Sequence, residues 1–110
     1  MDNESERIKK LTKIILDPLA ADHEKDDAAM DLEDYNDIEA LEALIKVASD
    51  PSANDLFALP QYGETIGIYW IRNDDFKKNI FLSLKDEAQG GVLSSIMRLK
   101  PEWIERYRLM

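Results

Sequence analysis

The chain has 110 residues, of which 45% are hydrophobic and 34% are charged, and it contains no cysteine. This length predicts a single domain over residues 1–110, and the composition is that of a globular protein. Without cysteine, neither a disulfide framework nor a thiolate metal site is possible. No apolar run approaches the roughly 18 residues that span a bilayer, and the polar N-terminus lacks the pattern of a secretory signal. We therefore expect a cytoplasmic protein with no membrane contact.

The net charge of −9 is concentrated between residues 21 and 60. This block holds twelve acidic residues against Lys25 and Lys46, a balance of −10. A negative field of this strength repels nucleic acid and anionic membranes and attracts basic partners. A solvated face is the ordinary interpretation of a charge run, and a docking face for a basic protein is the functional alternative.

The first half of the chain predicts three helices. Residues 4–16 carry Ile8, Leu11 and Ile15 at helical spacing, and the Asp-Pro pair at 17–18 ends that segment. Residues 20–34 form a second helix with small apolar residues and many aspartates, which are poor helix formers in a helix interior. Residues 36–48 form the clearest helix, for which Asn36 and Glu39 suit a capping box. The turn between the last two predicts an antiparallel hairpin.

The segment at 64–72 fits two structures. As a strand it is rich in β-branched and aromatic residues, with Ile66, Ile68 and Trp70 on one face. As a helix it is apolar nearly all round and must be central. An isolated strand would leave its backbone hydrogen bonds unmade, and no partner strand is evident, so we expect a helix. Before it, residues 52–63 form a connection with a short helical piece at 54–59, punctuated by Pro60 and Gly63.

The C-terminal part predicts three more short helical segments. The first carries Phe76, Ile80, Phe81 and Leu84 on one side. The second covers residues 86–99, with Leu99 among its inward residues, and the Gly90-Gly91 pair in it indicates a close contact or a bend. Pro101 suits the first position of a last helix. The fold class is therefore all-α, with short helical hairpins joined by short loops.

Two stretches, 20–50 and 64–100, have a similar helix-turn-helix order with a period near 40 residues, which is typical of HEAT and armadillo repeats. A plain helical bundle is the alternative arrangement. The string from Asp34 to Pro51, DYNDIEALEALIKVASDP, resembles the turn and second helix of a HEAT-like repeat. The string from Gly63 to Trp70, GETIGIYW, resembles the next repeat helix in small acidic bacterial HEAT-like proteins. Some members of that group resemble immunity proteins of contact-dependent growth inhibition and related polymorphic toxin systems. The resemblance implies an α-solenoid-like arrangement and binding to a cognate toxin domain.

Residues for catalysis are scarce. His23 is the only histidine, and no second histidine or cysteine can form a dyad with it. The glycines have neither P-loop nor dinucleotide spacing. An EF-hand loop beginning at Asp22 would need glycine at its sixth position, where Asp27 stands. We expect no enzyme activity, no cofactor and no metal site.

The aromatic residues divide into two groups. Trp70 and Trp103 lie on apolar stripes and are expected in the core. Tyr35, Tyr62 and Phe57 lie in or beside turns near the acidic block, where recognition residues are common. Basic residues near the C-terminus alternate with Glu102 and Glu105, which argues against direct nucleic-acid binding.

These observations give a functional hypothesis. We expect an immunity protein, a monomer before binding, that neutralises a basic toxin domain such as a nuclease. An acidic inhibitor would associate quickly with a basic active site because of electrostatic steering. The alternative is a helical adaptor within a protein assembly; a toxin gene immediately upstream would favour immunity. The predicted partner-binding residues are Asp27, Asp31, Asp34, Tyr35, Asp37, Glu39, Glu42, Phe57 and Tyr62.

Overall fold

The computed structural model describes residues 3–52 and 57–109, and within these ranges every regular element is helical. The elements are α1 (Asn3–Leu16), α2 (Asp22–Asp31), the 3-10 turn η1 (Leu32–Asp34), α3 (Ile38–Ala48), α4 (Leu59–Arg72), α5 (Lys78–Ser83), α6 (Asp86–Leu99) and α7 (Glu102–Arg106). The all-α prediction is confirmed. The ambiguous segment at 64–72 is helical, as expected, and lies within α4.

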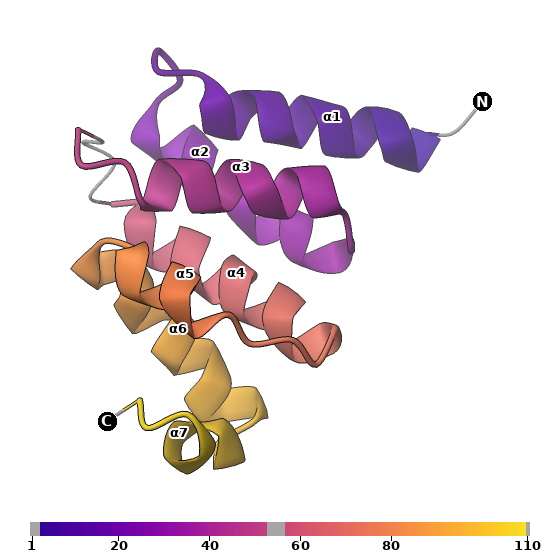
Figure 1. The fold of residues 1–110 in the computed structure, drawn as a ribbon. Helices are drawn as coiled ribbons and strands as arrows, with labels where there is room; N and C mark the ends of the chain where they lie inside the picture. Colours follow the sequence, from indigo (N-terminus) through magenta and orange to yellow (C-terminus); the bar gives the residue numbers. More distant parts are fainter. Residues whose placement is uncertain (1–2, 53–56, 110) are drawn as a thin grey trace.

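The helices are stacked in chain order (Figure 1). Helix α1 covers α2 and α3, and α4 packs on the other side of that pair. Helix α6 packs against α4, and α7 closes the opposite end from α1. The core runs continuously through the stack, from Ile15 of α1 through Leu44 and Ile66 to Trp103 of α7.

Helix α3 begins differently from the predicted capping box. Asp37 is the N-cap residue, and its carboxylate accepts a hydrogen bond from the backbone N–H of Ala40 at 3.0 Å. The side chain of Asn36 instead exchanges two hydrogen bonds with Asn73, at 3.1 and 2.9 Å. The predicted cap at Asn36 is therefore wrong, because that amide links the start of α3 to the end of α4.

Helix α2 is shorter than the predicted helix at 20–34. It ends at Asp31, and the chain tightens into η1 before turning toward α3. Ala28, Ala29 and Leu32 are buried, whereas the predicted apolar residue Ala21 is exposed. The packing face of α2 therefore consists mainly of small side chains, which allow α1 and α4 to approach it.

The tightest helix pair is α4 with α6, and glycines make the close approach possible. A Cβ on Gly63 would lie 1.9 Å from the carbonyl oxygen of Ala88, and one on Gly91 would lie 2.0 Å from that of Pro60. A Cβ on Gly67 would lie 3.0 Å from Cβ of Ser95. Of the two adjacent glycines, only Gly91 makes a close contact, since a Cβ on Gly90 would meet nothing within 4 Å.

Helix α4 begins earlier than expected. Pro60 and Gly63 lie inside its first turns, although the sequence predicts a connection there. Proline is accepted near a helix N-terminus because the first N–H groups have no intrahelical partner. Half of the predicted short helical piece at 54–59, namely residues 54–56, lies outside the described residues.

An aromatic cluster joins α4, α5 and α7. The Phe76 ring lies 5.4 Å from Trp70, 5.6 Å from Trp103 and 4.7 Å from Tyr107, measured between centroids. Trp70 and Trp103 are buried, which confirms their predicted core positions. Leu99, predicted to face inward, is half exposed at the end of α6. Pro101 is the N-cap residue of α7 and not its first residue.

Candidate partner-binding surface

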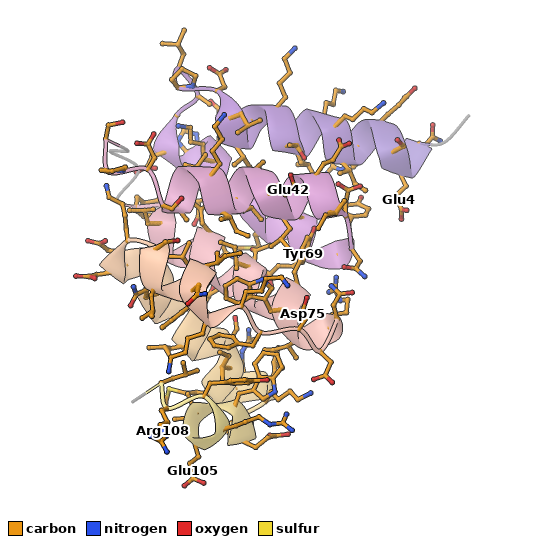
Figure 2. All side chains as sticks on the ribbon, in the orientation of Figure 1. Glu4, Glu42, Tyr69, Asp75, Glu105 and Arg108 are labelled. Atoms are coloured by element: carbon orange, nitrogen blue, oxygen red, sulfur yellow. The ribbon has the colours of Figure 1, made fainter. Side chains whose placement is uncertain are left out.

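Four of the predicted carboxylates are exposed and available to a partner. They are Asp27 on α2, Asp34 in η1, and Glu39 and Glu42 on α3. Among residues 3–52 and 57–109, none of the four takes part in a hydrogen bond or an ion pair. Figure 2 shows Glu42 on α3, far from Glu105 and Arg108 at the α7 end. We call Asp27, Asp34, Glu39 and Glu42 the free carboxylates.

Two further predicted carboxylates have structural roles. Asp31 is half-buried and pairs with Arg7 of α1, with Nη2 and Oδ2 3.2 Å apart. Asp37 is the N-cap of α3. A substitution at either position would therefore change helix packing or capping as well as surface charge. The free carboxylates have no such ion-paired or capping role in the described residues.

The three aromatic candidates lie in different environments. Phe57 is 65% exposed, and its backbone N–H donates to Oδ2 of Asp22 at 3.1 Å. Tyr35 is half-buried, and its backbone carbonyl accepts a hydrogen bond from Arg72. Tyr62 has no exposed surface, because it lies inside α4 and not in a turn. The prediction that Tyr62 contacts a partner is therefore wrong.

The acidic block has less exposed positive charge than its sequence indicates. Lys25, one of its two bases, is only 4% exposed and belongs to the packing face of α2 with Ala28 and Ala29. Its spacing of three and four from these alanines is the signal that could have revealed its burial. Among the described residues between 21 and 60, the solvent-facing charge is thus almost entirely negative.

Two carboxylates outside the predicted set have raised pKa values. Burial raises the pKa of Asp26, and the neighbouring charges of Asp27 and Asp22 raise it further. Burial is also the main cause of the raised pKa of Glu33, whose Oε2 accepts a hydrogen bond from Gln61 at 2.9 Å. Residue type alone does not predict the burial of these two carboxylates, since burial depends on how α2 and η1 pack.

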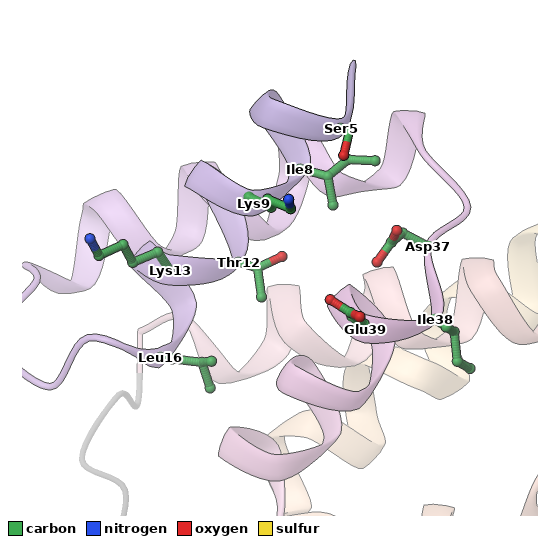
Figure 3. Close-up of a pocket in the computed structure, with 9 residues that line it drawn as sticks. All are labelled: Ser5, Ile8, Lys9, Thr12, Lys13, Leu16, Asp37, Ile38 and Glu39. Carbon is green, nitrogen blue, oxygen red and sulfur yellow. The ribbon is translucent and has the colours of Figure 1, made fainter. Parts of the chain in front are cut away.

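A groove lies between α1 and the beginning of α3 (Figure 3). Its volume is about 460 Å³, and it is lined by Ile8, Lys9, Lys13 and Leu16 of α1 together with Asp37 and Glu39 at the start of α3. The close-up shows the two carboxylates directed toward the α1 wall. Sequence reasoning did not find this groove, because it exists only where α1 crosses the start of α3.

Neither a metal-binding group nor a membrane-spanning helix is found among the described residues. In the parts of the chain that the structure describes, no three His, Cys, Asp or Glu side chains are grouped so that they could hold a metal ion. Over the same ranges, no helix is long and apolar enough to cross a membrane. No protein-family model, curated protein or solved structure matches this chain.

Proposed function

We propose that this chain is an immunity-type inhibitor that binds and neutralises a basic toxin domain such as a nuclease. The observation that carries this proposal is the set of free carboxylates on α2, η1 and α3. Opposite charges on two proteins raise the rate of encounter by steering, with association rate constants of up to about 10⁸–10⁹ M⁻¹s⁻¹ at low salt. Rapid capture suits an inhibitor that must act before a toxin reaches its substrate.

A nuclease is a suitable target for chemical reasons. Its substrate surface carries basic side chains that neutralise phosphates. Exposed carboxylates can bind the same side chains through charge-assisted hydrogen bonds, which are stronger than neutral ones. Phe57 and the half-buried Tyr35 add apolar contact area beside the charges. The inhibitor would therefore occupy the surface that binds the substrate.

The proposal includes a HEAT-like organisation and a cytoplasmic location. Support for the first comes from the stacking of α4 on the α2–α3 pair and of α6 on α4. Gly63 contacts Ala88, and Gly67 contacts Val92 and Ser95, so the contacts advance in the same direction along α4 and α6. Stacking of each helical unit on its neighbour is expected when helical repeats follow one another.

The test requires a toxin gene immediately upstream of the gene for this chain, and it uses the toxin domain which that gene encodes. Co-expression should restore growth of cells that produce this domain, and stopped-flow fluorescence should give the association rate of the purified pair. Raising the salt concentration should slow association steeply. Reversing the free carboxylates, Asp27→Lys, Asp34→Lys, Glu39→Lys and Glu42→Lys together, should slow it tenfold or more.

A matched control separates local charge from net charge. Asp86, Glu87, Glu102 and Glu105 are exposed on α6 and α7 and belong to none of the elements that carry the free carboxylates. Reversing these four to lysine changes the net charge by the same amount and should slow association much less. Equal slowing by both sets would reject α2 and α3 as the docking surface, and an unchanged rate in both would reject electrostatic capture.

A further inference from the structure

The groove between α1 and α3 has the form of a binding site for a helix. Residues Ile8, Lys9, Lys13 and Leu16 recur at helical spacing along one side of α1. At a rise of 1.5 Å per residue, the stretch from Ile8 to Leu16 extends about 12 Å, or a little more than two helical turns.

The two walls of the groove carry opposite charges that do not pair with each other. Lys9 and Lys13 are exposed on the α1 side, and Glu39 is exposed on the α3 side. Within the described ranges, none of these three side chains forms an ion pair or a hydrogen bond. Asp37 adds a second carboxylate to the α3 wall. An occupant with both charges could satisfy both walls at once.

Apolar side chains lie between and beside these charges. Ile8 is nearly buried, whereas Leu16 is 45% exposed and Ile38, at the α3 side, is 65% exposed. An amphipathic helix binds such a groove through apolar residues at three- and four-residue spacing. The charges on the walls would then select the residues along the two edges of that helix.

We propose that this groove binds an amphipathic helix of a partner protein. The apolar stripe of the helix packs on Ile8, Leu16 and Ile38. Acidic residues along one edge face Lys9 and Lys13, and a basic residue on the other edge faces Asp37 and Glu39. This proposal does not rest on inhibition of a toxin, because it needs a partner with acidic and basic edges and not a uniformly basic surface.

The experiment is a selection from a displayed library of 14-residue helical peptides, with the full chain as bait. Enriched peptides should share an apolar stripe with acidic residues on one edge and a basic residue on the other. Fluorescence anisotropy with a labelled enriched peptide should show tenfold or greater weakening by the Lys9→Glu, Lys13→Glu double variant. Lys10 is also exposed on α1 but does not line the groove, so Lys10→Glu should change the affinity by less than twofold.

Other results would overturn the proposal. These are a lack of enrichment, equal weakening by the double variant and Lys10→Glu, or NMR shift changes from the peptide outside α1 and the start of α3. A dimer in sedimentation that the double variant dissociates would show that a second copy occupies the groove. Reversing Lys9 and Lys13 adds negative charge, so it would not slow capture of a basic toxin, and the two proposals can fail separately.

Discussion

The contact between α4 and α6 gives a sharp prediction for single methyl groups. Gly63→Ala would place Cβ 1.9 Å from the Ala88 oxygen and 2.7 Å from its carbonyl carbon. Both are backbone atoms of α6, so the helices must separate. Overpacking of this kind costs about 1–3 kcal/mol, and occasionally more. We expect a net loss of about 2 kcal/mol, although alanine is the better helix former by up to about 1 kcal/mol.

Two companion variants make the prediction specific. Gly91→Ala should destabilise to a similar extent, because its Cβ would lie 2.0 Å from the Pro60 oxygen. Gly90→Ala has the same chemistry one residue away with no atom within 4 Å, so it should stabilise the fold by about 0.5–1 kcal/mol. The three variants therefore gain the same helix propensity from alanine. They differ only in whether the new Cβ meets the neighbouring helix.

The assay is urea unfolding followed by far-ultraviolet circular dichroism. With the typical scaling of midpoint against free energy, a loss of about 2 kcal/mol also lowers Tm by roughly 8 °C. Because α4 and α6 are in close contact at Gly63 and Gly91 but not at Gly90, Gly90→Ala should be more stable than the parent chain. The other two variants should be much less stable than the parent chain. Three variants within about 0.5 kcal/mol of one another would refute the close approach of α4 and α6.

Three further predictions concern buried or bridging polar groups. The raised pKa of Glu33 means that the folded state binds its proton more tightly than the unfolded state, so unfolding free energy should rise as pH falls from 7 toward 5; Glu33→Gln should flatten this rise in urea titrations at each pH. Tyr69 donates a hydrogen bond to the Leu32 oxygen at 2.7 Å, so Tyr69→Phe should lose about 1 kcal/mol of unfolding free energy. Burial raises the pKa of Tyr69 to about 12, so the phenolate absorbance titration of the same variant should lack the ionisation that occurs at the highest pH. Arg72 donates to the Glu33 carbonyl at 2.6 Å and to that of Tyr35, and Arg72→Met should lower unfolding free energy by about 1–2 kcal/mol in the urea assay.

Much of the fold could be predicted because periodicity and backbone hydrogen bonding act locally. The helix expected at 86–99 is α6, with the same bounds. The helix at 64–72 follows from the hydrogen-bond requirement, against its β-branched composition. The start of α4 was missed because Pro60 and Gly63 usually interrupt helices, whereas here Pro60 lies in the first turn and Gly63 provides room for α6.

The candidate surface was less predictable, because residue type does not determine what a side chain contacts. Tyr62 lies next to Gly63 and near Pro60, which suggested a turn, but α4 carries it into the core. Asp31 and Asp37 have the same charge as Asp27 and Asp34 but are engaged by Arg7 and by the backbone of α3. The groove beside α1 forms where two helices cross. The sequence pattern of a single helix does not predict where it crosses another.

Basic side chains lie beside the acidic block only at some of its positions, and this distribution supports a functional origin for the free carboxylates. Where folding brings the block against other elements, basic side chains are present: Arg7 meets Asp31, Lys25 is buried in α2, and Arg72 binds the carbonyls at η1. The free carboxylates have no such compensation, and net repulsion between like charges destabilises a compact chain. Glu39 lies in the first turn of α3, where a negative charge is favourable, but neither capping nor packing explains the charges of Asp27, Asp34 and Glu42. Binding to a basic surface would remove the repulsion, and this is the physical advantage that the immunity hypothesis assigns to them.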